Sequence, residues 1–161
     1  KKEEAGFDYI DSFQSDFAVK QNDNLSEVAR LFFTSSSPRW VDILFSLRNR
    51  IVKIFGLKVP SDITSDIDNR SYEKGEQIGI FKIFDKTENE LILGENDKHL
   101  DFKVSLLVEG ITESTAQKML SITTLVKYNN WFGRLYFLPV QFFHRLIVQR
   151  MLKRIIEKLE S

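Results

Sequence analysis

The sequence predicts an α+β domain in which a curved antiparallel sheet of about five or six strands packs against a long C-terminal helix. Several segments alternate apolar and polar residues with the two-residue period of strands, and turn-forming residues separate them. The last stretch, residues 139–159, instead repeats its apolar residues at intervals of three and four, as an amphipathic helix does. At 161 residues the chain has the usual size of one domain, so we expect a single domain over residues 1–161.

The first two elements are a strand and a short helix. Aromatic residues alternate with polar ones over residues 7–17, which is typical of a half-buried strand. Asp23 or Asn24 can then cap a helix, because apolar residues recur at intervals of three and four from Leu25 onward. This helix is expected to end at the serine-rich residues 34–38.

A second short helix and a loop are expected next. Pro38 fits the first turn of a helix over residues 38–55, and Gly56 can end it. Residues 57–77 carry proline, glycine, aspartate and serine without sustained periodicity, so they predict a loop.

Four strand-like segments follow, and together they predict an antiparallel meander. In the third of them the even-numbered residues from Leu100 to Val108 are apolar, whereas Asp101, Lys103 and Ser105 are polar. One face of that strand is therefore expected to be buried and the other wet. The four predicted strands are residues 79–85, 90–95, 100–109 and 115–127.

The C-terminal part of the chain predicts the longest helix. The apolar residues 131–138 fit a further extended segment, with Gly133 as a bend, and Pro139 then fits the first helical turn. The helix over residues 139–159 has one basic face, which we interpret as a solvated surface rather than a nucleic-acid or membrane contact. Its apolar face comprises Val140, Phe143, His144, Ile147, Val148, Met151, Leu152, Ile155, Ile156 and Leu159.

Composition excludes several classes of function. Lys plus Arg and Asp plus Glu are both 23, so no net field attracts nucleic acid, and no nucleic-acid partner is expected. The absence of cysteine excludes disulfides, a thiolate nucleophile and a cysteine-ligated metal. No apolar run is long enough to span a bilayer, and the first residues lack the apolar core of a signal peptide. We therefore expect a cytoplasmic protein without a membrane span.

The sequence carries no motif for a cofactor, a metal or an activated serine. It has no GxGxxG or Walker-type loop, no GxSxG, and no HExxH among its two histidines, His99 and His144. No cofactor and no metal site are therefore predicted.

Two polar residues lie on otherwise apolar helix stripes. His144 would point at the sheet, where a histidine can bond a ligand carbonyl or act as a general acid or base, although a satisfied core histidine fits the pattern too. Arg48 falls on the inward stripe of the predicted second helix and needs an anionic partner. That partner is a carboxylate of Asp8, Asp11 or Glu109 in a structural ion pair, or the acid group of a ligand.

The first strand offers hydroxyl and carboxyl groups. Tyr9 and Asp11 share one face of this strand, whereas Asp8 and Asp11 point to opposite faces and cannot form a carboxylate pair of the glycosidase kind. Tyr9 and Tyr136 can orient a ligand with their hydroxyls, and are equally typical of core residues with a wet tip.

Three local patterns, taken in their order along the chain, resemble a known superfamily. The overall layout is similar to the helix-grip fold of the START-related, or polyketide cyclase, superfamily (SRPBCC), and most closely to a small uncharacterised bacterial family of that kind. The patterns are Asp8-Tyr9-Ile10-Asp11, then Trp40 with Leu47-Arg48 and Phe55-Gly56-Leu57, and finally Gly133-Arg134-Leu135-Tyr136-Phe137 with Val140 and His144.

The resemblance implies a sheet curled around the last helix, with an apolar cavity between them that holds a small hydrophobic molecule. The 14 phenylalanines can line such a cavity or fill it as a dry core. The candidate ligand-binding residues are Tyr9, Asp11, Trp40, Arg48, Phe102, Val104, Leu106, Tyr136, Phe143, His144 and Ile147.

Two other functions stay open at this point. One is a cyclase-like or dehydratase-like enzyme, in which His144 or Asp11 moves protons on a polyketide-like substrate. The other is a structural or partner-binding module without a ligand, using an exposed sheet edge. A monomer and a homodimer are both compatible with the sequence.

Overall fold

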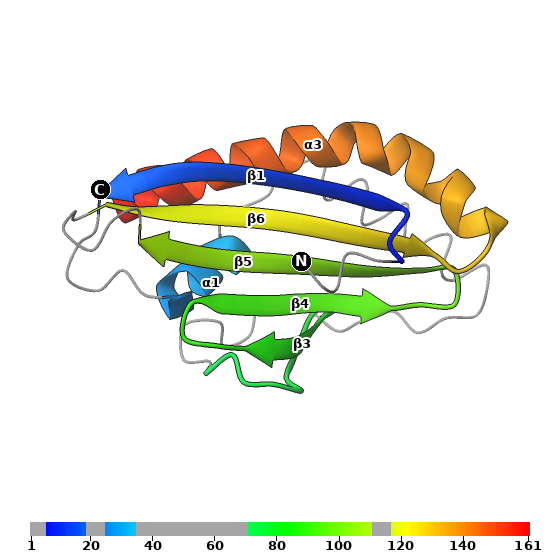
Figure 1. Cartoon of the computed structure of the whole chain (residues 1–161), viewed down its shortest axis with the longest axis horizontal. Coiled ribbons are helices and arrows are strands. Elements are labelled where there is room, and N and C mark those ends of the chain that lie inside the picture. Colours follow the sequence, from blue (N-terminus) through cyan, green and yellow to red (C-terminus); the bar gives the residue numbers. More distant parts are fainter. Residues whose placement is uncertain (1–5, 19–24, 35–70, 111–116) are drawn as a thin grey trace.

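The computed structural model describes residues 6–18, 25–34, 71–110 and 117–161 (Figure 1). The predicted second helix over residues 38–55 and most of the loop after it lie outside these residues. In chain order the described elements are β1 (Tyr9–Ala18), α1 (Leu25–Thr34), β2 (Gln77–Ile78), β3 (Phe81–Lys86), β4 (Glu90–Asn96), β5 (Leu100–Gly110), β6 (Gln117–Tyr128) and α3 (Trp131–Leu159).

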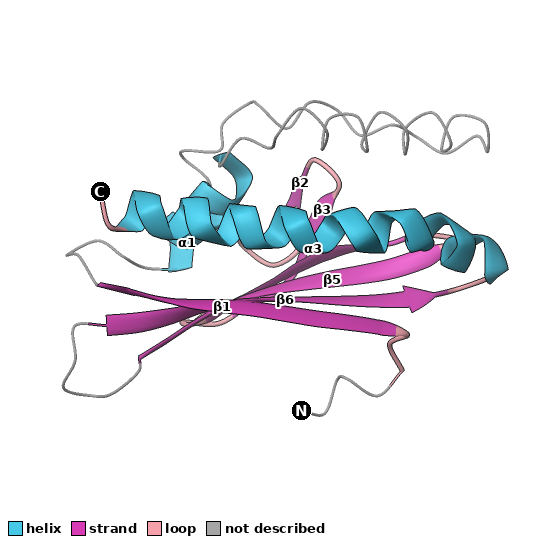
Figure 2. Cartoon of the chain, turned by 90° about the horizontal axis from the view of Figure 1, so that it is seen from above, coloured by secondary structure: helices cyan, strands magenta, loops and turns pink. Residues whose placement is uncertain are grey.

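The six described strands form one antiparallel sheet in the order β1-β6-β5-β4-β3-β2. Strands β2 to β6 are a meander of sequential neighbours, and β1 joins the free edge of β6, from the pair Tyr9 and Val126 to the pair Ala18 and Gln117. The sheet is curved, and α3 runs along one of its faces (Figures 1 and 2). The predicted fold class, an α+β domain with a curved antiparallel sheet and a long C-terminal helix, is confirmed.

Alternation along the strands decides which side chains meet the helices. The odd-numbered residues of β1 and the even-numbered residues of β5 and β6 point to the helical face, as the burial of these strands shows. On the other face of β5, which was predicted to be wet, Lys103 and Ser105 are half-buried.

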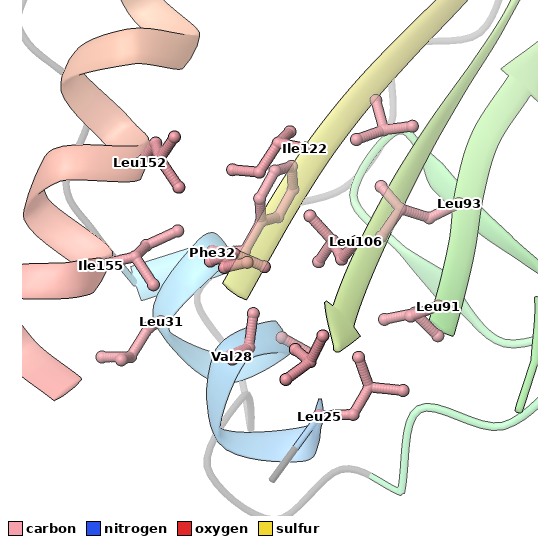
Figure 3. Packing of buried hydrophobic residues seen from close by; sticks show 14 of the residues in the cluster. Leu25, Val28, Leu31, Phe32, Leu91, Leu93, Leu106, Ile122, Leu152 and Ile155 are labelled. Carbon is pink, nitrogen blue, oxygen red and sulfur yellow. The ribbon is translucent and has the colours of Figure 1, made fainter. Parts of the chain in front are cut away.

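The larger hydrophobic cluster joins α1, the sheet and the C-terminal half of α3. Figure 3 shows Val28 and Phe32 of α1 beside Leu106 and Ile122 of the sheet, with Ile155 of α3 close to them. Each fully buried aliphatic side chain of this kind contributes about 1.5–3 kcal/mol to stability. This cluster therefore fixes α1 and the end of α3 on the sheet.

A second, smaller cluster lies at the other end of α3. It joins Tyr9 of β1, Val126 of β6 and Phe137 of α3, whose ring meets the Tyr9 ring edge-on at a centroid distance of 5.0 Å. Phe102 of β5 packs against both clusters. The interface between α3 and the sheet is therefore apolar at its two ends.

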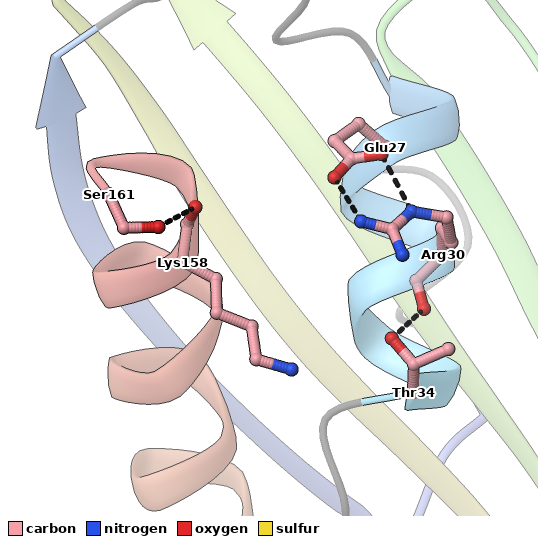
Figure 4. Close-up of polar contacts among 5 residues, drawn as sticks. All are labelled: Glu27, Arg30, Thr34, Lys158 and Ser161. Carbon is pink, nitrogen blue, oxygen red and sulfur yellow. Dashed lines mark hydrogen bonds and ion pairs between the residues drawn. The ribbon is translucent and has the colours of Figure 1, made fainter.

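In α1 and at the C-terminal end of α3, the polar contacts join residues that are close in the sequence (Figure 4). Arg30 donates from Nε and Nη2 to the carboxylate of Glu27 on the preceding turn of α1, at 2.8 and 2.6 Å. Thr34 donates to the Arg30 carbonyl at the end of α1, and Ser161 donates to the Lys158 carbonyl at the end of α3. These bonds satisfy carbonyl groups of the last helical turns.

The prediction of an extended segment over residues 131–138 is wrong, because α3 already begins at Trp131. The Asn130 side chain caps the helix by accepting a hydrogen bond from the Gly133 amide at 3.0 Å, and it donates to the Lys98 carbonyl at 3.0 Å. This cap anchors the start of α3 to the turn between β4 and β5. Gly133 is a point of close approach rather than a bend, since a Cβ there would lie 2.0 Å from the His99 carbonyl oxygen.

Pro139 lies inside α3 and does not begin it. Proline removes one helical hydrogen bond, the one to the carbonyl of Leu135 four residues earlier. Leu135 is 56% exposed and Pro139 is exposed too, so the proline lies on the solvent side of α3, where a helix tolerates a lost hydrogen bond. The helix therefore continues through the proline.

Candidate functional site

One polar layer separates the two hydrophobic clusters of the helix–sheet interface. Each of three elements places a polar residue at the same level: Asp11 on β1, Thr124 on β6 and His144 on α3. Asp11 and Thr124 are direct partners across the β1–β6 ladder, so the register of that ladder fixes them side by side. The next inward-facing residues on either side of this level belong to, or pack against, the apolar clusters; they are Tyr9 and Phe13 on β1, Ile122 and Val126 on β6, and Val140 and Val148 on α3.

The layer is held together by short contacts around the Asp11 carboxylate. Its Oδ2 lies 3.2 Å from Nδ1 of His144 and 2.5 Å from the Tyr9 hydroxyl, and Nε2 of His144 lies 3.4 Å from Oγ1 of Thr124. The Asp11 side chain is 8% exposed and that of His144 is 19% exposed. The group is therefore almost enclosed, with the imidazole nearer to solvent than the carboxylate.

Electrostatics favour the ionised form of Asp11. Burial by itself raises the pKa of this carboxyl, but the hydrogen bonds from His144 and Tyr9 outweigh burial, and the pKa is lowered from its ordinary value. An ionised carboxylate only accepts hydrogen bonds, so Nδ1 of His144 and the Tyr9 hydroxyl are both donors. For Tyr9 the effect is opposite: burial and the bond to Asp11 raise the pKa of its phenol.

Within residues 6–18, 25–34, 71–110 and 117–161, the second carboxylate oxygen of Asp11 finds no hydrogen-bond partner. Oδ1 is buried, and among the described residues no donor reaches it with hydrogen-bond geometry. The Thr124 hydroxyl also lowers the pKa of Asp11, but it has a single proton to donate and lies 3.4 Å from Nε2 of His144 as well. A buried charged oxygen without a donor destabilises the folded state by about 1–3 kcal/mol or more, so it calls for a partner beyond those that the described residues supply.

The imidazole orientation defines the chemistry that this layer can perform. With Nδ1–H donating to Asp11, a neutral His144 presents the lone pair of Nε2 toward Thr124. A carboxylate that fixes a histidine tautomer in this way prepares the other nitrogen to accept a proton. The layer can therefore bind a hydrogen-bond donor at Asp11 and exchange a proton at His144.

Arg145 lies at the solvent edge of the layer. Its Nε is 3.4 Å from the Tyr9 hydroxyl, although its side chain is exposed. The basic face of the last helix was predicted to face away from the sheet, and no pattern in the sequence singled out Arg145. Thr124 was also missed, because only the pairing of β6 with β1 shows that it lies beside Asp11.

The structure brings three of the predicted site residues together and separates others from them. Tyr9, Asp11 and His144 form the layer, whereas Phe143 is 43% exposed and its ring contacts Phe142. The other histidine, His99, is bonded to Asn130 at the start of α3. Of the remaining candidates, Phe102, Tyr136 and Ile147 are half-buried, Val104 and Leu106 belong to the larger cluster, and Trp40 and Arg48 lie outside the described residues.

Comparison with known proteins gives a family match. A family model described as "protein of unknown function (DUF2867)" matches residues 4–151, which include the complete polar layer. No curated protein matches the chain. Of the helices in the described ranges, none is long and apolar enough to cross a membrane. Since this family model covers most of the sequence, the chain belongs to the DUF2867 family.

Proposed function

We propose that this protein binds a small, largely apolar molecule that carries a hydrogen-bond donor, at the polar layer between α3 and the sheet. The observation that carries the proposal is Asp11 Oδ1, a buried and charged acceptor to which no described residue donates a hydrogen bond. Small-molecule sites in proteins are mostly apolar and contain a few polar groups that orient the ligand. The layer fits this description, because an acceptor and an imidazole lie between two apolar clusters.

The neighbours of the layer define the expected contacts of the ligand. Phe102 packs against both clusters, Val104 is paired with Thr124 across the β5–β6 ladder, and Ile147 lies one turn after His144 on α3. We assign the apolar part of the ligand to these three side chains. A hydroxyl or amine of the ligand donates to Asp11 Oδ1, which offsets the cost of burying that oxygen.

We also propose that the DUF2867 family is related to the START-like, or SRPBCC, superfamily. A curved antiparallel sheet, a first strand at the edge next to the last strand, and a long C-terminal helix along one face support this relationship. The ligand site proposed here then occupies the interface where that superfamily holds its hydrophobic ligands.

A displacement assay tests the binding proposal. Nile red bound to the protein is titrated with a long-chain primary alcohol and, separately, with the methyl ether of the same chain, which lacks the donor. A hydrogen bond to a charged acceptor is worth about 1.5–3 kcal/mol. The alcohol is therefore expected to displace the dye at a concentration at least roughly tenfold lower than the ether needs. Equal displacement by the ether, or no dye binding at all, refutes the proposal.

Two variants separate the role of Asp11 from general effects of substitution. Asp11→Leu removes the acceptor and is expected to abolish the preference for the alcohol over the ether. Asp16→Asn is the matched control, because Asp16 lies on the same strand but its side chain is on the exposed face. Native mass spectrometry of the purified protein provides an independent readout, since a bound molecule adds a defined mass that Asp11→Leu should reduce.

The bond between His144 and Asp11 favours one second candidate, an enzyme of the cyclase or dehydratase kind. In it, Nε2 of His144 removes a proton next to a carbonyl of a polyketide-like substrate, while Asp11 holds the imidazole in place. The test is turnover of a poly-β-ketone thioester, followed by absorbance across a range of pH. The enzyme hypothesis requires that turnover disappears in His144→Gln while the protein stays folded. If the wild type shows no turnover and His144→Gln changes only stability, the histidine is structural.

A further inference from the structure

We propose that the outward face of the first half of α3 docks on an anionic lipid surface. The face is formed by Trp131, Leu135, Leu138, Phe142 and Leu146, called here the α3 ridge. Their spacings of four, three, four and four residues place them on one side of the helix, over a length of about 22 Å. This surface is separate from the polar layer and serves a different partner.

The ridge is unusually apolar for a solvent-exposed surface. Trp131 is 76% exposed, Phe142 69% and Leu138 60%. In the described part of the chain there are seven exposed large hydrophobic residues, and six of them lie between Trp131 and Leu146, counting Phe143 beside the ridge. Contiguous exposed apolar surface of this kind marks an interaction site, whereas single exposed hydrophobic residues do not.

The charges around the ridge define the partner. Helix α3 carries six basic residues and one acidic residue, a formal charge of +5, while the whole chain is neutral, so the rest carries −5. All six basic side chains are exposed. Two of these basic residues, Arg134 and Arg145, lie within the length of the ridge, and the other four follow it along α3. A helix with aromatic and leucine residues on one side and arginine and lysine beside and beyond them lies in the interface of a membrane that contains anionic lipid.

A second copy of the chain is a poorer partner for the same surface. A symmetric dimer through the ridge brings Arg134 and Arg145 of one copy close to the same residues of the other, and like charges across an interface oppose association. An anionic lipid surface instead pairs with both features at once, because its headgroups attract the basic residues and its acyl boundary accepts the apolar ridge.

Sedimentation with vesicles tests the proposal. The intact chain is mixed with vesicles of phosphatidylcholine alone and with vesicles of phosphatidylcholine and phosphatidylglycerol, at low and at high salt. The protein is expected to sediment with the anionic vesicles, and high salt should weaken this binding because salt screens exposed charges. Absence of binding to the anionic vesicles, or equal binding to both kinds, overturns the proposal.

Matched variants identify the surface involved. Leu138→Ser with Phe142→Ser is expected to weaken binding roughly tenfold or more, since each side chain loses its burial in the lipid. Ile10→Ser is the control, because Ile10 is 44% exposed on β1, away from α3. Unchanged vesicle binding in the ridge variant refutes the assignment. The assignment is also refuted if the wild type self-associates without lipid and the ridge variant does not.

A second pair of variants tests the charges. Arg134→Gln with Arg150→Gln should weaken binding to the anionic vesicles about fivefold for each charge removed. Lys82→Gln with Lys127→Gln removes the same charge from exposed positions on the sheet and should leave binding nearly unchanged. Equal effects of the two pairs would show that net charge alone, and not the ridge, attracts the protein to lipid. Circular dichroism checks that every variant is folded.

Discussion

Gly133→Ala sets two physical effects against each other, and the structure decides which is larger. In an ordinary helix interior this substitution stabilises a protein by about 0.5–1 kcal/mol, because glycine loses more backbone entropy on folding. At Gly133, however, the new Cβ would lie 2.0 Å from the His99 carbonyl oxygen and 2.8 Å from the His99 carbonyl carbon. Both atoms are backbone, so no side-chain rotation relieves the clash.

The magnitude follows from how far the two elements must separate. Ordinary contact begins at 3.4 Å, so the start of α3 must move by 1.4 Å, the difference from 2.0 Å, relative to the turn between β4 and β5. Overpacking of this kind destabilises by about 1–3 kcal/mol. The movement also stretches the Asn130 cap, whose complete loss is worth about 0.5–2 kcal/mol. After subtracting the helix gain, we expect a net loss of about 1–4 kcal/mol.

Urea unfolding followed by circular dichroism measures this loss as a lower midpoint at unchanged m-value. Gly110→Ala is the matched control, because nothing lies within 4 Å of a Cβ at that exposed position, and its stability should change little. If Gly133→Ala is as stable as the wild type or more so, the close approach of α3 to the turn does not constrain the fold.

Three further predictions concern the polar layer and the core. Because the pKa of Asp11 is lowered in the folded state, its contribution to stability is present above the ordinary aspartate pKa of about 3.9 and is lost as the pH falls through the folded value. Asp11→Asn should therefore flatten the acid limb of a plot of stability against pH, whereas Asp16→Asn should not change it. Tyr9→Phe removes a donor to a charged acceptor and should lower the free energy of unfolding by about 1.5–3 kcal/mol in the same urea assay; a loss below the error of the assay would contradict the 2.5 Å contact. Ile155→Ala, at a fully buried position, should lose about 2–5 kcal/mol. Leu138→Ala, at a 60% exposed position, should stay within about 0.5 kcal/mol of the wild type in thermal unfolding, and equal losses in the two variants would show that Leu138 is not exposed.

Local patterns in the sequence predicted most of the described elements. Strand β5 alternates so regularly that its buried face, including Val104 and Leu106, follows from the two-residue period alone. The same period placed Tyr9 and Asp11 on one face of β1, and helical spacing placed His144 on the inward side of the last helix. In the structure these three side chains meet, because β1 and α3 lie against each other.

The error at residues 131–138 has a tertiary cause. Proline is favoured at the start of a helix, so the sequence alone favours a helix that begins at Pro139. The actual start depends on Asn130, whose side chain bonds to Lys98 and Gly133. Those partners lie near Asn130 only after the β4–β5 turn has formed. A cap that joins residues distant in the chain leaves no local signal.

By itself, the sequence determined the fold class, the antiparallel order of the meander and, except for Phe143, the inward faces of its strands and last helix, because those follow from periodicity and turn chemistry between neighbours in the chain. Only the tertiary structure decided where α3 begins, that Thr124 lies beside Asp11, that one oxygen of Asp11 has no donor in the part of the chain that the structure describes, and that the α3 ridge is exposed. Each of these depends on the register and distance between elements that are far apart in the sequence. Such quantities are fixed by packing and by ladder hydrogen bonds, and the order of residues along one segment does not contain them.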